Sequence, residues 1–260
     1  FYTIFIHVDL LKDHIWEQIK EEDGDITKHV WPRIKVKEGE VFGSIGVGKF
    51  DFYVVDADVT LGGFASPKLY EHEAWKIHTV DTFDYYGEPI RTELLKKNIR
   101  TAEPLGGKID YDIKGKLIGN WFKEGTGGYK GLDVTTDYWN NHMAIAYDSI
   151  DPEHIVISIG DFNGRAEQFG VKTNSPDPKD VDINSGIIKY ELVSYDHYVN
   201  NQKWDISKFA TNLKAKNRDE VRGVALFQLI ENKKLKVEFF PNKKGSQVSG
   251  FTNNAVFFER

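Results

Sequence analysis

The tripeptide Gly119-Asn120-Trp121 and the stretch Ala255-Val256-Phe257-Phe258-Glu259-Arg260 decide the fold that the sequence predicts. The tripeptide lies early in a strand-rich C-terminal part, and the second stretch supplies the last strand of that part. A sheet that closes on itself brings its first and last strands side by side. We therefore expect the Trp121 indole to plug one end of a barrel. The Arg260 guanidinium should lie across it, as a cation over an aromatic face.

The C-terminal part has many short apolar segments separated by turn residues, a pattern typical of an antiparallel barrel or sandwich. Residues 187–192 alternate, with Ile188, Tyr190 and Leu192 expected inside and the lysine and glutamate between them outside. We predict strands over residues 108–122, 142–148, 155–160, 186–193, 222–230, 234–240 and 254–260. The segments 161–185 and 194–220 are predicted to be long loops at the barrel mouth, where loops tend to carry specificity.

Gly119 and Trp121 on a first strand, together with Arg260 on a last strand, resemble the signature of lipocalin-like, or calycin, barrels. Such barrels are containers, so the resemblance implies non-catalytic binding of a small, partly apolar ligand, with these three residues in structural roles. By strand parity, the ligand-binding wall is expected at Ile145, Tyr147, Ile157, Tyr190 and Phe227. The alternatives are a dry core filled by the same side chains, or a plain β-sandwich.

The first 104 residues differ from the rest in charge. They carry 13 Lys and Arg against 19 Asp and Glu, whereas residues 105–260 carry 21 of each. We predict a strand over 2–8, a helix over 10–22, a hairpin over 34–46 that turns at Glu38-Gly39, and strands over 50–55 and 75–80. The segment 101–107 is the predicted linker. The chain is thus predicted to be mainly β with two domains, a β-rich scaffold or lid at 1–104 and a barrel at 105–260.

The hairpin over residues 34–46, followed by Trp75-Lys76-Ile77-His78, resembles the barrel-sandwich hybrid fold of lysostaphin-type zinc endopeptidases. In that family a His-x-His pair supplies zinc ligands, and here Lys76 stands in place of the first histidine. A catalytic zinc needs three protein ligands, so the resemblance implies the fold with a degenerate active site. The alternative function is a zinc-dependent hydrolase that uses His7 and His78, with His78 as the candidate metal ligand.

Two further expectations concern the chain as a whole. It opens in strand-like sequence at Phe1-Tyr2 without a Met, so we expect the N-terminal strands of the hybrid domain to be missing. From the stretches 75–86 and 119–122, the whole chain is also similar to a two-domain bacterial and archaeal family of unassigned function. The family resemblance favours an extracytoplasmic location.

Composition argues against several other classes of function. The chain has no cysteine, which rules out disulfides and thiolate chemistry. No apolar run approaches the roughly 18 residues of a transmembrane helix. The net charge of −6, without a basic stripe, argues against a nucleic acid partner. No Gly-x-Ser-x-Gly motif is present for a serine nucleophile. A third hypothesis is a structural or cell-surface interaction protein with filled cores.

One loose group of polar residues is a further candidate for a metal site. His72, Glu73, His78 and Asp81 lie close together in the sequence, but their spacing follows no recurrent pattern of metal ligands. We therefore interpret them as exposed polar residues on a loop and a strand, and expect the protein to carry no cofactor.

Overall fold

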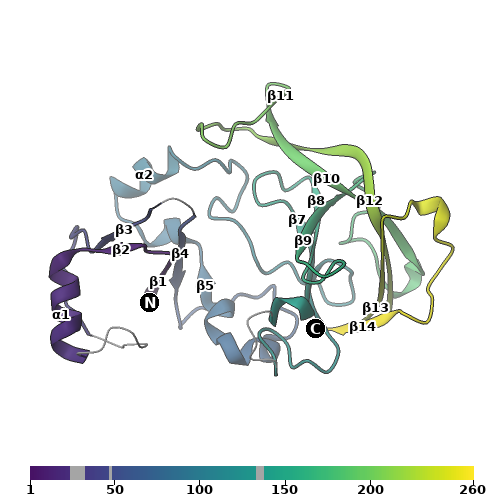
Figure 1. Ribbon diagram of the computed structural model, residues 1–260, viewed down its shortest axis with the longest axis horizontal. Helices are drawn as coiled ribbons and strands as arrows, with labels where there is room; N and C mark the ends of the chain where they lie inside the picture. Colours follow the sequence, from purple (N-terminus) through teal and green to yellow (C-terminus); the bar gives the residue numbers. More distant parts are fainter. Residues whose placement is uncertain (24–32, 47–48, 133–137) are drawn as a thin grey trace. The chain divides into compact units, whose positions relative to one another are not determined.

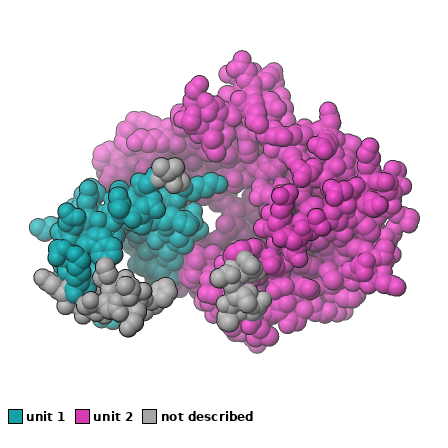
Figure 2. All heavy atoms as spheres, in the orientation of Figure 1, with its two compact units in different colours: residues 1–55 teal, residues 56–260 magenta. Residues whose placement is uncertain are grey.

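Eight antiparallel strands close into a barrel in the C-terminal part of the computed structural model (Figure 1). The structure describes residues 1–23, 33–46, 49–132 and 138–260. These residues form two compact units, residues 1–55 and residues 56–260 (Figure 2). The barrel belongs to the second unit.

The barrel strands follow one another around the wall in chain order. They are β6 (Gly119–Lys123), β7 (His142–Tyr147), β8 (Ile155–Ile159), β9 (Glu167–Val171), β10 (Ile188–Val199), β12 (Lys214–Glu231), β13 (Lys234–Pro241) and β14 (Val256–Glu259). Each pairs with the next, and β14 returns to pair with β6, which closes the sheet. The short β11 (Gln202–Lys203) extends the far end of the β10–β12 hairpin. The mainly β class and the antiparallel barrel predicted from the sequence are therefore confirmed.

Alternation along the strands places one set of side chains inside the barrel, because successive residues of a strand face opposite sides of a sheet. On β7 and β8 the inward residues include Ile145 and Ile157, which are paired in register and fully buried. On β12 and β13 they include Phe227 and Val237, which are likewise paired and buried. These side chains belong to one core cluster that draws on all eight strands.

Trp121 and Arg260 meet at one end of this core, which we call the floor. The Cζ atom of Arg260 lies 4.1 Å from the centroid of the Trp121 ring, within the range of a cation–π contact. Both side chains are buried, and the indole N–H donates a 2.9 Å hydrogen bond to the carbonyl of Leu117. The contact expected from the sequence is confirmed.

The Arg260 guanidinium is also held by backbone oxygens of the segment that precedes β6. Its Nη2 donates to the carbonyls of Ile113, at 2.7 Å, and Lys116, and its Nη1 donates to the carbonyl of Ile118. Burial lowers the pKa of Arg260 to about 10. The end of the last strand is thereby tied to the approach to the first strand.

Gly119 is required where the guanidinium passes over β6. Its φ of +126° is a backbone conformation that residues with a side chain rarely adopt. A Cβ atom there would lie 2.6 Å from Nη1 of Arg260 and closer still to a carboxylate oxygen of Asp112. The glycine of the Gly-x-Trp pattern therefore makes room for the arginine.

Two segments outside the strands cover the outer face of the barrel. The first includes the 3₁₀ helix η1 (Pro67–His78), and its Phe64 and Tyr70 form a cluster with Phe122, which points outward from β6. The second, the connection between β13 and β14, contains the 3₁₀ helix η5 (Gly245–Gln247) and packs Val248 on Val224 and Leu226 of β12. Residues 56–80 thus belong to the same compact unit as the barrel.

The first unit contains small sheets and one helix. Strand β1 (Tyr2–Ile6) pairs with β4 (Asp51–Val55), and β2 (Leu10–Leu11) pairs with β3 (Gly43–Ser44). Helix α1 (Asp13–Asp23) buries Ile15 and Ile19. The remaining elements, which lie in the second unit, are β5 (Thr79–Val80), η2 (Thr82–Tyr85), α2 (Ile90–Leu95), η3 (Tyr138–Asn141) and η4 (Ile183–Ser185).

Several predicted elements need correction. The strand predicted over 108–122 begins only at Gly119. Residues 75–78 end a 3₁₀ helix, and only Thr79–Val80 are strand. The predicted turn at Glu38-Gly39 is present, but 34–42 form no strand, because Gly43–Ser44 pair with β2 rather than with the other arm of the hairpin. The predicted boundary at 104/105 differs from the division at 55/56 and stays a prediction about independent folding.

The two predicted mouth loops also contain strands. Residues 161–185 include β9, which supplies the wall between β8 and β10. Residues 194–220 are largely the outer part of the β10–β12 hairpin, whose register shifts near Val193 where the strand bends. Residues 172–187, by contrast, lie at the floor, where Leu117 N–H donates to Val181 and Ile118 N–H donates to Pro178.

The floor contact can be measured with a double-mutant cycle. We expect Trp121→Ala to lower the free energy of unfolding by about 3–5 kcal/mol through the cavity it leaves. Arg260→Met should cost about 2–4 kcal/mol, since it strands three carbonyls. The two changes should be non-additive by about 1 kcal/mol or more in urea unfolding. Trp121→Ala combined with Val248→Ala, in a separate cluster, should be additive. Equal coupling in both pairs would contradict the assigned contact.

Candidate functional site

The five predicted wall residues all lie in or against the interior core. Ile145, Ile157, Tyr190 and Phe227 are almost completely buried, and Tyr147 packs on the same cluster at its edge. Strand parity therefore placed these side chains on the correct side of the sheet. Whether they touch a ligand stays a prediction.

The two tyrosine hydroxyls, however, are directed away from the mouth. Tyr190 donates a 2.7 Å hydrogen bond to the carbonyl of Pro176, and Tyr147 donates a 2.6 Å hydrogen bond to the Asp177 carboxylate. Both acceptors lie in the 172–187 segment at the floor. The hydroxyl groups of both tyrosines are therefore engaged at the end of the barrel opposite the mouth.

A row of aromatic rings runs through the core from Tyr190 toward the end opposite the floor. The ring centroids of Tyr190 and Phe227 lie 6.0 Å apart, and those of Phe227 and Phe239 lie 6.3 Å apart. Phe239 in turn lies 6.2 Å from Phe162, which is 4.7 Å from Phe169. The three pairs among Phe227, Phe239, Phe162 and Phe169 are edge-to-face, which is a favourable arrangement. The row connects a predicted wall residue with Phe162, on the β8–β9 loop.

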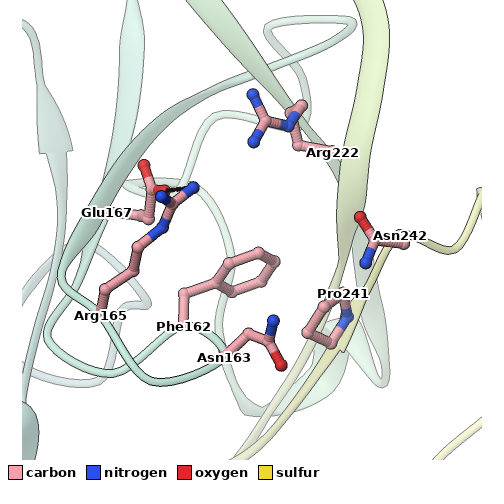
Figure 3. A pocket seen from close by; sticks show the side chains of 7 residues that line it. All are labelled: Phe162, Asn163, Arg165, Glu167, Arg222, Pro241 and Asn242. Carbon is pink, nitrogen blue, oxygen red and sulfur yellow. Dashed lines mark ion pairs between the residues drawn. The ribbon is translucent and has the colours of Figure 1, made fainter.

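The row ends at a small cavity, which we call the mouth pocket (Figure 3). Its volume is about 90 Å³, room for a small ligand group or several water molecules. The β8–β9 connection contributes one side, and the ends of β12 and β13 contribute the other. The lining residues are Phe162, Asn163, Arg165, Glu167, Arg222, Pro241 and Asn242.

Local sequence explains how Phe162 and Arg165 reach this position. Asn163 and Gly164 both have positive φ, and the N–H of Phe162 donates to the carbonyl of Arg165 at 2.8 Å. This is a two-residue hairpin turn, for which Asn-Gly is the preferred sequence. These pocket residues were not predicted from the sequence, although the Asn-Gly pair was a signal for the turn that carries them.

Gly223 provides the space for the Phe162 ring. A Cβ atom on Gly223 would lie 2.8 Å from Cζ of Phe162 and 2.8 Å from the carbonyl oxygen of Phe240. Any side chain at this inward position of β12 would therefore displace the ring. Phe162 is buried as a result, although it stands on a loop, and its ring forms the apolar base of the mouth pocket.

A second group of polar residues lies where the β10–β12 hairpin meets the β7–β8 loop. The Asp148 carboxylate is 2.8 Å from Nε2 of His197 and accepts a 3.1 Å hydrogen bond from the Tyr195 hydroxyl. Burial opposes ionisation of Asp148, yet the hydrogen bonds from His197 and from the backbone outweigh it and lower the pKa to about 2. The hydrogen bond to Asp148 raises the pKa of His197.

Neighbouring contacts give this group a structural role. Asp151 accepts hydrogen bonds from the Lys214 side chain, at 3.1 Å, and from the Ala215 N–H, at 2.9 Å. His154 is buried with its ring 4.8 Å from that of Tyr195, and burial lowers its pKa. These contacts fasten the outer part of the hairpin to the loop between β7 and β8.

The histidines considered as metal ligands have other partners. His78 places Nδ1 2.7 Å from the carbonyl of Val59, and His7, in the first unit, lies 3.8 Å from the Asp51 carboxylate. Glu73 pairs with Lys130, and Asp81 accepts hydrogen bonds from the N–H groups of residues 83 and 106. No group of three His, Cys, Asp or Glu suited to a metal ion occurs among the residues that the structure describes.

Comparison with known proteins adds no assignment. No family model, no curated protein and no solved structure matches this chain. Within the described ranges, no helix is both long enough and apolar enough to cross a membrane.

The Asp148–His197 pair predicts a pH-dependent stability. Because the folded-state pKa of His197 is raised, its contribution is fully present below pH 6.5 and is lost as the pH rises through that raised value. We expect His197→Gln to lower the free energy of unfolding by about 1–3 kcal/mol at pH 5.5 and by less at pH 9. Urea unfolding at both pH values measures the difference.

The exposed His72→Gln is the matched control, and it should change stability little at either pH. His154, Asp151 and Lys214 lie beside the pair in both the parent and the variant, so the comparison isolates the effect of the substituted side chain. A loss from His197→Gln that is the same at pH 5.5 and pH 9 would contradict a charged His197 in the folded state.

Proposed function

We propose that the barrel binds a small, partly apolar ligand at its mouth, without catalysing a reaction. The observation that carries the proposal is that the mouth pocket opens directly on Phe162, the outermost ring of the interior row. A ligand seated in the pocket would touch polar side chains at the rim and an aromatic core beneath them. Ligand sites commonly combine an apolar lining with a few placed polar groups.

The position of Phe162 in the chain supports entry at this point. Phe169, Tyr190, Phe227 and Phe239 stand on strands that are hydrogen-bonded to neighbours on the barrel wall, whereas Phe162 stands on the turn between β8 and β9. Loops open at a lower free-energy cost than the strands of a core. Movement of this turn would expose the interior row without breaking the wall.

The energetics favour modest affinity. Burying a phenylalanine side chain is worth about 1.5–3 kcal/mol, and a ligand ring that replaced Phe162 would bury a similar apolar area. The exchange of one ring for the other is therefore nearly neutral. Net affinity must come from contacts at the rim, and we expect dissociation constants in the micromolar range.

We also propose that the barrel is related to the lipocalin-like barrels. Two observations support the proposal: the strands follow chain order around the wall, and Arg260 lies over Trp121 at the floor. Lipocalin-like barrels hold ligands inside an eight-stranded wall. The relationship would extend the same kind of activity to this chain.

The neutral fluorescent probe N-phenyl-1-naphthylamine tests the proposed function. We expect the probe to bind the full chain saturably, and the increase in probe fluorescence measures this binding. Phe162→Ala should tighten binding about fivefold or more, because it adds an apolar cavity that a ring can fill. Phe162→Trp should weaken binding by filling the same space. Phe209→Ala, an exposed phenylalanine near β11, is the matched control and should bind like the parent.

Phe162→Ala is also expected to cost about 3–5 kcal/mol of stability, so near-ultraviolet circular dichroism must show that each variant keeps its native packing. Probe binding that does not saturate in the parent, or that is unchanged by both substitutions of Phe162, would refute a binding site at the mouth and favour a filled core with a structural role.

A further inference from the structure

The two arginines of the mouth pocket have different electrostatic surroundings. Arg165 forms an ion pair with Glu167, with Nη2 and Oε1 2.5 Å apart. The side chain of Arg222, at the start of the barrel part of β12, has no ion pair or hydrogen bond with any residue that the structure describes. Figure 3 shows its guanidinium on the side of the pocket that faces this pair.

The position of Arg222 makes an unpaired cation costly. Its side chain is only partly exposed, and it lines a cavity whose base is the buried ring of Phe162. Removing a charge from water is unfavourable unless a partner replaces the lost hydration. A guanidinium offers five N–H donors in a planar fork, which matches the oxygens of a carboxylate or a phosphate.

The neighbouring groups fit the same kind of ligand. The side-chain amides of Asn163 and Asn242 also line the cavity and can donate hydrogen bonds to an oxyanion. The volume of about 90 Å³ accommodates a group of this size above the Phe162 ring. Arg165 is a second guanidinium at the rim, although Glu167 neutralises its charge.

We propose that the mouth pocket binds an oxyanion of the ligand, a carboxylate or a phosphate, through the guanidinium of Arg222, with the apolar part of the ligand directed at the aromatic row beneath the pocket. The inference rests on the proposed function and specifies its ligand as an amphipathic anion. Glu167 then acts as a competitor within the site, because it holds Arg165 and repels the incoming charge. Substituting Glu167 should free Arg165 for the ligand.

A matched pair of probes tests the inference with the full chain. The compound 8-anilinonaphthalene-1-sulfonate is N-phenyl-1-naphthylamine with one added sulfonate, so the ratio of their affinities isolates the contribution of the oxyanion. We expect Arg222→Gln to weaken binding of the sulfonate about tenfold while binding of the neutral probe changes less than about twofold. Glu167→Gln should tighten binding of the sulfonate and leave the neutral probe unaffected.

Lys243→Gln is the matched control, since it removes the same charge beside Asn242 from a side chain outside the pocket lining. It should leave the affinity ratio nearly unchanged. Displacement of the sulfonate probe by inorganic phosphate or by acetate then distinguishes a phosphate from a carboxylate preference.

The failure of this inference differs from the failure of the proposed function. If the neutral probe binds saturably but Arg222→Gln leaves the affinity ratio unchanged, or lowers it no more than Lys243→Gln does, the oxyanion site is refuted and apolar binding stands. If neither probe binds the parent saturably, both proposals are refuted.

Discussion

The barrel depends on a buried guanidinium at the place where its first and last strands meet. The first and last strands, β6 and β14, are paired through only two residue pairs, Phe258 with Lys123 and Glu259 with Phe122. The next residue, Arg260, adds a contact with Trp121 and hydrogen bonds to three carbonyls before β6. A buried charge is costly unless hydrogen bonds compensate it. Both terminal nitrogens of Arg260 have carbonyl partners, whereas its Nε has none among the described residues. Side-chain contacts therefore secure a closure that the backbone ladder alone supports weakly. A glycine at position 119 meets the same need, since a Cβ there would collide with the guanidinium and with Asp112.

The closure could be predicted from sequence because it requires particular residue types at the two ends of one sheet. The strands β7, β8 and β13 could be predicted because their apolar residues recur at every second position. Strand β9 could not: of its five residues only Phe169 and Val171 are large and apolar, and its partners β8 and β10 supply the hydrogen bonds that make it a strand. The outer part of the β10–β12 hairpin could not be predicted for the same reason. Its residues are largely polar, and backbone hydrogen bonds between the two strands, rather than burial, hold it together. Context of this kind has no local signature.

The candidate site, too, could be predicted from the sequence only in part. Parity identified the interior side chains correctly, but it could not say which polar groups would meet them. The hydroxyls of Tyr147 and Tyr190 are used by the 172–187 segment, whose place at the floor depends on contacts with residues 117 and 118. Parity also cannot place a side chain on a turn. Phe162 enters the core because Gly223, distant in sequence, leaves an inward position vacant. The hairpin turn at Asn163-Gly164 could be predicted from the sequence. Its role in the pocket could not, because the pocket also requires residues of β12 and β13.

Arginine at the two ends of the barrel shows how one chemistry can serve stability or recognition. At the floor, Arg260 is buried, and the protein itself supplies carbonyls and an aromatic face, so the cation is committed to the fold. At the mouth, Arg222 is half-buried beside a cavity, and the described residues supply it with neither a carboxylate nor a carbonyl. A fold gains nothing from leaving a partly desolvated cation without a partner. An unpaired Arg222 does, however, attract anions. A ligand oxyanion would find hydrogen-bond donors already in place, so its binding would require little rearrangement of the protein. Arg260 thus stabilises the closure of the barrel, whereas Arg222, as we propose, gives the mouth a preference for negative charge.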